Sequence, residues 1–346
     1  MANIAVTNFC NLKCPYCFAD DMICEEKRHI TMDELRRTLS WLARTPKNHV
    51  GIIGGEPTLH PHFSDIIKEV NIYCRDCDTG ATLFTNGIYL DKFVSELGDR
   101  FGVLINCNPP EEMGPENEKK FHATMDHLDL LSWFGRRANC GCNLHIGRTD
   151  YSYIWELVER YRLPRLRVSV TAPGGMYTEW RARKETYYTQ MKPIFLQFCQ
   201  DAREHGIHLG SDCNHIPECY FTKSEMELVA EVLEDRPQGF CQPVVDITPD
   251  FRATACFGSY DTVDCAQFED LMQLEQYLLL KKSYPRMCAN ATGRCASCSN
   301  HDLLICQGGC LGFADCAITQ SNPARSLDGA VAESTEVNEN DGNDAS

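Results

Sequence analysis

The sequence of 346 residues predicts an α/β protein, a partial (β/α)6 barrel followed by a small cysteine-rich module. Short apolar runs alternate with helical patterns up to about residue 212, as in βα units around a parallel sheet. Beyond that point the alternation stops and cysteines become dense. The last stretch is rich in Asn, Asp, Glu and Ser and has no aromatic residue, which is typical of disorder. We therefore expect a barrel over 1–212, a module over 213–320 and a disordered acidic tail over 321–346.

The elements of the predicted barrel follow one another in a regular order. Six short apolar segments are expected to be strands, at 4–6, 49–53, 81–84, 103–105, 143–146 and 166–170. Between the first two, Thr31 and Glu34 form a capping-box pattern that opens a helix with Leu35 and Leu39 on its apolar face. Residues 63–73 form the next helical pattern.

Polar residues gather where the predicted strands end. The first strand runs into three cysteines, the second into Gly-Gly-Glu-Pro, the third into Thr85 and Asn86, and the fourth into Asn106. The fifth runs into the segment 147–150. Because ligands of parallel α/β folds bind at the carboxyl ends of the strands, the sequence predicts one site at one rim of the barrel.

The three cysteines, Cys10, Cys14 and Cys17, have the spacing C-x3-C-x2-C. Soft thiolates suit iron–sulfur clusters, which are usually held by four cysteines, so three thiolates would leave one iron open to an exchangeable ligand. The alternative is zinc, since a C-x2-C pair is more often half of a zinc site. A zinc site would need a second pair nearby, and Cys24 is the one candidate close to residue 17.

Taken together, in this order and spacing, the cysteine motif and the Gly-Gly-Glu-Pro segment resemble those of the radical S-adenosylmethionine (radical SAM) enzymes. The resemblance implies a partial barrel and a [4Fe–4S] cluster whose open iron chelates the amino and carboxylate groups of SAM. It places the amino group of SAM against Gly54, Gly55, Glu56 and Pro57. It further implies that Tyr16 lies against the adenine, that Asn106 meets the ribose, and that Gly147 to Asp150 stands for a Gly-x-x-Glu segment beside the adenine.

Not every residue of this set is specific. Thr85 and Asn86 join the SAM contacts because of their expected place at the rim. Asn106 and Asp150 are equally well explained as ordinary loop residues that cap strand or helix ends. The sequence assigns no catalytic side chain beyond the residues that hold the cluster and SAM.

The second group of cysteines resembles the SPASM extension, which follows the barrel in many radical SAM enzymes and usually binds two auxiliary [4Fe–4S] clusters. A small loop-rich module lacks a core large enough to fold without such cross-links. The resemblance assigns one auxiliary cluster to Cys241, Cys256 and Cys310 with either Cys219 or Cys213. It assigns the other to Cys295, Cys298, Cys306 and Cys316. Phe251 replaces the usual glycine and one cysteine gap is two residues longer, so one or two auxiliary clusters are expected, with zinc as the rival.

Composition excludes several classes of partner. A net charge of −16 argues against nucleic acid, whose binding proteins usually carry a basic face. No apolar run approaches the ~20 residues of a membrane helix, so no membrane partner is expected. The first residues lack a signal-peptide pattern, and 21 cysteines in a long chain without one favour a reducing cytoplasm and an anaerobic habitat.

The resemblance implies reductive cleavage of SAM to a 5′-deoxyadenosyl radical that abstracts hydrogen from a substrate. Enzymes with this extension mostly modify peptides, so a peptide maturase that forms a crosslink or oxidises a residue is the leading function. A dehydrogenase or epimerase of a small polar metabolite such as a carbohydrate is the alternative, and an iron–sulfur electron-transfer or scaffold protein is the alternative outside enzymes. A flavodoxin or ferredoxin-type reductant and a separate peptide-recognition protein are the expected partners.

Overall fold

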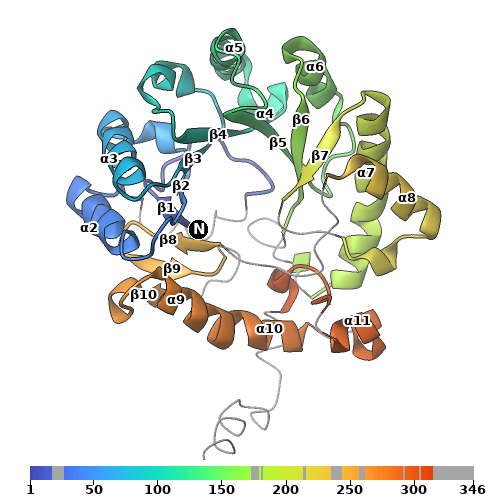
Figure 1. Ribbon diagram of the computed structural model, residues 1–346. Helices are drawn as coiled ribbons and strands as arrows, with labels where there is room; N and C mark the ends of the chain where they lie inside the picture. Colours follow the sequence, from blue (N-terminus) through green and yellow to red (C-terminus); the bar gives the residue numbers. More distant parts are fainter. Residues whose placement is uncertain are drawn as a thin grey trace, which may run out of the picture.

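The structure is a computed structural model. It describes residues 1–17, 27–172, 179–180, 182–212, 216–234, 244–256, 262–290, 293–303 and 305–314. Within them a single curved sheet of ten strands forms an open barrel, with helices around its outside (Figure 1). The partial barrel predicted from the sequence is confirmed.

The strands of the sheet lie in the order β10-β9-β8-β1-β2-β3-β4-β5-β6-β7, and the pairs from β8 to β7 are all parallel. The strands are β1 (Ala2–Ala5), β2 (Val50–Ile53), β3 (Ala81–Thr85), β4 (Phe101–Asn106), β5 (Ala138–Leu144), β6 (Arg165–Val170), β7 (His208–Ser211), β8 (Val245–Ile247), β9 (Arg252–Thr254) and β10 (Val263–Asp264). All six predicted strands are present. The fifth begins five residues earlier than predicted, at Ala138, because its first half is made of small and polar residues that carry no strand pattern.

The helices are α2 (Met32–Leu42), α3 (Phe63–Asp76), α4 (Pro110–Met113), α5 (Pro115–Leu130), α6 (Ser152–Tyr161), α7 (Lys184–Glu204), α8 (Lys223–Val232), α9 (Leu271–Leu278), α10 (Tyr284–Ala289) and α11 (Ser299–Asp302). The predicted capping box opens α2, where the Thr31 side chain accepts a hydrogen bond from the Glu34 amide and the Glu34 carboxylate accepts one from the Thr31 amide. None of the helices among the described residues is long and apolar enough to cross a membrane.

The chain beyond residue 212 returns to the first strand. β8 pairs in parallel with β1, with Ala2 opposite Val245, and the Asn3 amide donates to the Asp246 carboxylate at 2.7 Å. β9 and β10 extend the sheet in antiparallel fashion. From this edge, helices α9 to α11 run across the open side of the barrel toward α7 (Figure 1). The division of the chain at residue 212 stays a prediction, although the sheet continues across it.

Candidate functional site

The loop after β1 and the loop after β2 lie side by side at the carboxyl ends of the strands. The Gly55 amide donates to the Thr7 carbonyl and the Glu56 amide donates to the Phe9 carbonyl, both at 2.8 Å. A Cβ atom on Gly54 would lie 2.4 Å from the Thr7 oxygen, and one on Gly55 would lie 2.3 Å from the Phe9 oxygen. Such distances are far inside van der Waals contact, so both glycines are required for the two loops to meet.

The carboxylate of Glu56 connects the ends of β2 and β3. It is fully buried, and Oε1 accepts hydrogen bonds from the Thr58 hydroxyl at 2.6 Å and from the Thr85 hydroxyl at 2.7 Å. The Thr58 amide also donates to Oε1, and the Asn86 amide donates to Oε2 at 2.8 Å. Burial raises the pKa of Glu56, while these hydrogen bonds lower it. The structure thus brings Glu56, Thr85 and Asn86 together, as expected from their places at the rim.

Asn86 and Pro57 complete the connection between these loops. The Asn86 side chain donates to Asn11 of the cysteine loop at 2.8 Å, so the end of β3 also holds that loop in place. Pro57 is buried at the start of a short 3-10 helix, Pro57–Leu59.

The three cysteines of the first loop lie in a partly buried setting and influence one another's charge. Burial raises the pKa of Cys14 to about 12, and the charges of Cys10 and Cys17 raise it further. Burial also raises the pKa of Cys10, whose thiol lies close enough to Glu56 for that carboxylate to add to the shift. Thiolates that oppose one another's ionisation need a positive centre, and iron would supply it. The donor set therefore fits a [4Fe–4S] cluster held by these three residues.

A chain of amide side chains leads from the cysteine loop across the barrel rim. The hydroxyl of Tyr16 donates to Asn108 and accepts from Asn106 at 2.7 Å, and Asn106 accepts from Asn143 at 2.5 Å. Asn108 also accepts from the Cys14 thiol at 3.3 Å. Tyr16 and Asn106, predicted separately, thus make direct contact at this rim.

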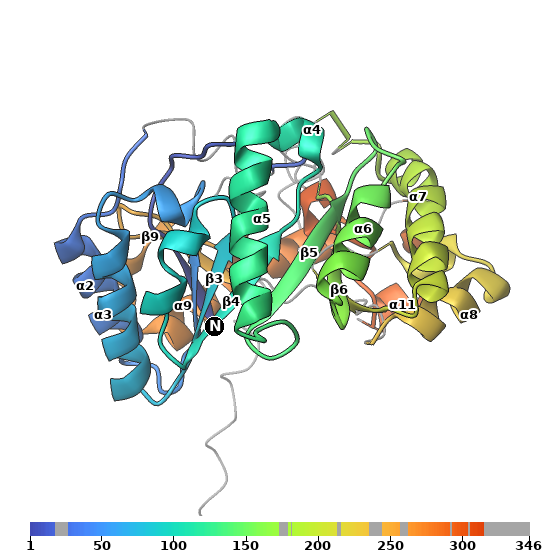
Figure 2. The same cartoon turned by 90° about the horizontal axis from the view of Figure 1, so that it is seen from above.

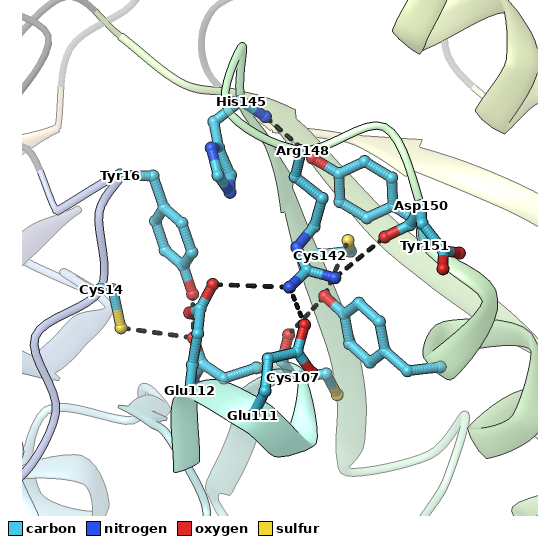
Figure 3. A network of polar contacts seen from close by, with 12 residues as sticks. Cys14, Tyr16, Cys107, Glu111, Glu112, Cys142, His145, Arg148, Asp150 and Tyr151 are labelled. Atoms are coloured by element: carbon cyan, nitrogen blue, oxygen red, sulfur yellow. Dashed lines mark hydrogen bonds and ion pairs between the residues drawn. The ribbon is translucent and has the colours of Figure 1, made fainter.

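Sequence reasoning missed Asn108, Asn143 and His145 as parts of this site. Asn108 follows the end of β4, so the same rule that selected Asn106 could have found it. The ring of His145 lies 5.6 Å from that of Tyr16, and burial lowers the pKa of His145 to about 4 (Figure 3). The strand boundaries predicted around residue 143 hid Asn143, because that residue was taken as the start of a strand and lies near the end of β5.

The predicted segment Gly147 to Asp150 contributes an arginine in place of an acid. Asp150 is exposed, and its carboxylate accepts from the Ser152 amide at 2.9 Å at the start of α6. Arg148 donates to the Asp150 carbonyl at 3.0 Å and pairs with Glu111, and it lies 3.8 Å from Glu112 (Figure 3). Asp150 thus has the capping role left open by the sequence, and Arg148 is the residue of this segment that points over the rim.

Glu112 is a further rim residue that the sequence did not reveal. It lies close enough to Cys14 to raise the pKa of that thiol. Burial raises the pKa of Glu112 itself, and its buried Oε2 has no hydrogen-bond partner within the described part of the chain. An acceptor with this setting suits a cationic group.

The second group of cysteines is brought together in part. Cys219, Cys295, Cys298 and Cys306 lie close enough for their charges to interact, since the last three all raise the pKa of Cys219 after burial, its largest cause. Cys310 lies on the same stretch, where its amide donates to the Tyr188 hydroxyl at 2.8 Å. Cys256 follows β9. Cys213, Cys241 and Cys316, like Cys24 and the predicted tail, lie outside the described residues.

Comparison with protein families matches residues 4–128 to the radical SAM superfamily. Among curated proteins, the chain is similar to the GTP 3′,8-cyclase of Mesorhizobium japonicum, with 32% identity over 135 residues, 37% of this chain and 39% of that protein. It is also similar to the GTP 3′,8-cyclase of Vibrio vulnificus, with 30% identity over 135 residues, 36% of this chain and 40% of that one. These matches span about two fifths of the length of the curated relatives.

Two solved structures share the fold over most of the chain. Streptococcus suis SuiB bound to S-adenosylmethionine aligns with a TM-score of 0.60 and 16% identity, over 89% of this chain and 72% of that one. Native anSMEcpe with bound AdoMet aligns with a TM-score of 0.62 and 17% identity, over 89% and 88%. Radical SAM domains bind a [4Fe–4S] cluster and SAM, and the loops of β1 and β2 fit both. Residues 4–128, with their cysteine loop and its paired glycine loop, place this chain in the radical SAM superfamily.

Proposed function

We propose that this chain is a radical SAM enzyme that abstracts hydrogen from a peptide substrate. The observation that carries the radical chemistry is the direct pairing of the Gly54–Gly55 loop with the cysteine loop. Two backbone hydrogen bonds of 2.8 Å join these loops, and the buried carboxylate of Glu56 connects them to β3. A site that chelates SAM at a cluster needs both loops at a fixed separation, and this pairing provides it.

When bound, the cluster and SAM supply an electron and a carbon radical able to remove hydrogen from an unactivated carbon. The chain positions these groups and keeps water away from them. Cys10, Cys14 and Cys17 hold three irons. The backbone of Gly54 to Pro57 presents carbonyl groups toward the amino group of SAM, and Tyr16, held by Asn106 and Asn108, provides a flat surface for the adenine.

Support for a peptide substrate comes from the extent of the fold similarity. SuiB has been solved with the precursor peptide SuiA, and anSMEcpe with the Cp18Cys peptide, and both align with 89–90% of this chain. The alignment therefore includes cysteine-rich sequence beyond residue 212. A separate recognition protein and a flavodoxin or ferredoxin-type reductant would complete such a system.

A nucleotide substrate is the second candidate, because the curated relatives are GTP 3′,8-cyclases. Their similarity covers 135 residues, and the family match ends at residue 128. This part of the chain holds the cysteine loop and the glycine loop, which every substrate class would share. The similarity thus supports the radical chemistry more strongly than it supports GTP.

The test uses anaerobically reconstituted protein with SAM and dithionite. We expect release of 5′-deoxyadenosine, and its loss when Cys10, Cys14 and Cys17 are replaced by Ala. Synthetic peptides from short reading frames beside the gene should then raise the rate and lose hydrogens by mass spectrometry. Stimulation by GTP, with conversion of GTP, would replace the peptide assignment with the nucleotide one. Folded, iron-loaded protein that releases no 5′-deoxyadenosine would overturn both.

A further inference from the structure

Two segments far apart in the sequence meet beside the start of α7. Cys219 lies in the 3-10 helix Glu218–Tyr220, and Cys295 lies in the 3-10 helix Gly293–Ser297. Arg294 joins them, since its guanidinium donates to the Cys219 carbonyl at 2.9 Å and lies 4.8 Å from the ring centre of Tyr220. Glu185 of α7 accepts from the Arg294 amide at 3.2 Å and from the Tyr220 hydroxyl at 2.9 Å. These contacts fix the backbone of Cys219 beside that of Cys295.

The thiols of these segments form one electrostatic group. Burial and then the charges of Cys295, Cys306 and Cys298 raise the pKa of Cys219. Cys306 and Cys298 likewise raise the pKa of Cys295, after burial. The relation is the same as that of Cys10 and Cys17 to Cys14 in the first loop.

The spacing of these thiols favours a cluster over a single ion. A zinc ion would need four sulfur atoms about 2.3 Å from one point. Across the described ranges, no three His, Cys, Asp or Glu side chains converge in that way. In a [4Fe–4S] cube each sulfur binds a different iron, so the thiolates stand further apart around a larger centre.

A buried cation lies against the same group. Lys184 is 7% exposed, and its ammonium lies 2.7 Å from the Asn290 carbonyl, 3.3 Å from the Asn290 side-chain oxygen and 3.8 Å from the Cys295 sulfur. The Gly308 amide points at the Cys306 sulfur at 3.4 Å. A Cβ on Gly308 would lie 2.8 Å from the Cys295 sulfur, so glycine allows this close approach. Positive charge and amide donors beside sulfur are the features that stabilise a reduced cluster.

We infer that Cys219 is the fourth ligand of a [4Fe–4S] cluster held with Cys295, Cys298 and Cys306. Sequence resemblance placed Cys219 or Cys213 with Cys241, Cys256 and Cys310, and gave the fourth position here to Cys316. With four thiolates the cluster has no iron open to a substrate, so its role is electron transfer. Lys184 is a positioning residue that offsets the negative charge of the ligands. The inference concerns iron binding and does not depend on the identity of the substrate.

The experiment measures iron and sulfide in anaerobically reconstituted protein, with electron paramagnetic resonance of the reduced form. Cys219→Ala is expected to lower iron by about one to four atoms per chain, because three thiolates remain of the four that such a cluster takes. Cys288→Ala is the matched control, since this exposed cysteine lies on α10 of the same region and should keep the full iron content. Cys219→Ser should keep a cluster with an altered spectrum, which tests the ligand without relying on loss of iron.

A combination of variants decides which cluster Cys219 serves. Replacement of Cys295, Cys298 and Cys306 by Ala should remove about four irons. Adding Cys219→Ala to that triple variant should remove no more. Further loss of iron would show that Cys219 serves another cluster, and unchanged iron and spectra in both Cys219 variants would show that it is no ligand. Zinc in place of iron at these residues would also overturn the inference. Release of 5′-deoxyadenosine by the same samples reports separately on the first cluster.

Discussion

Replacing Gly55 by Ala tests whether the close pairing of two loops sets the SAM site. The new Cβ would lie 2.3 Å from the Phe9 oxygen, 2.6 Å from the Phe9 carbonyl carbon and 3.0 Å from the Cβ of Cys10. Ordinary contact begins at 3.4 Å, so the loops must separate by about 1.1 Å. That movement acts on backbone atoms, which cannot turn aside as a flexible side chain can. It also displaces the first cluster cysteine.

Two consequences follow from this displacement. The two hydrogen bonds between the loops contribute roughly 1 kcal/mol each, and overpacking costs ~1–3 kcal/mol, so unfolding should become easier by about 3–5 kcal/mol. A misplacement of ~1 Å at a reacting centre can lower a rate ~100-fold. We therefore expect Gly55→Ala to lose iron from the first cluster and to release 5′-deoxyadenosine about 100-fold more slowly.

The assay is dithionite-driven release of 5′-deoxyadenosine, normalised to iron, with urea unfolding alongside. Gly210→Ala is the matched control, because a Cβ on this strand residue would have its nearest neighbour at 3.8 Å. The control should differ little from the parent. Release within twofold of the parent in Gly55→Ala, at full iron content, would refute the reasoning.

Four further outcomes are expected. Glu56→Gln should lower the free energy of unfolding in urea by about 1–3 kcal/mol, because its amide nitrogen must face a backbone N–H, such as that of Asn86, whichever way it turns; an unchanged midpoint would contradict this. Thr31→Ala should cost ~1 kcal/mol through loss of the cap of α2, without any change in iron. Burial holds the pKa of His145 near 4, below its ordinary 6.5, so the unfolded chain takes up the proton first and stability should fall by up to ~1.4 kcal/mol per unit as pH drops through that window. His145→Gln should flatten that slope relative to the parent, and parallel curves would show that this histidine is not responsible. Lys184→Met should lower the reduction potential of the cluster at Cys219, since a nearby positive charge favours the reduced form; redox titration followed by paramagnetic resonance measures it, and an unchanged potential would exclude the role.

The sequence was sufficient for the parts of the site that depend on neighbouring residues. The cysteine loop and the glycine loop each carry their chemistry within eight residues, and the rule for parallel strands was enough to expect them at one rim. The contact of Glu56 with Thr85 and Asn86 follows from the same rule, because β2 and β3 are adjacent. The capping box of α2 is equally local and was predicted to the residue.

Other parts depend on contacts that no local pattern carries. β7 and β8 are short and contain polar residues, and β8 becomes a strand because β1 offers an open edge far away in the sequence. The grouping of Cys219 depends on Arg294 and Glu185, which come from two other segments. Cysteine spacing alone could not select this group, since spacing does not say how three loops fold against α7.

The pairing of β8 with β1 has a consequence for the order in which the protein forms during synthesis. Asn3 and Asp246 lie 243 positions apart, so one edge of β1 stays unpaired until most of the chain has left the ribosome. At 5–20 residues per second that interval is roughly ten seconds or longer. An apolar strand with an open edge is prone to associate with other chains. Chains that end before residue 244 would keep that edge open permanently, and we expect them to aggregate even though they contain both SAM-binding loops.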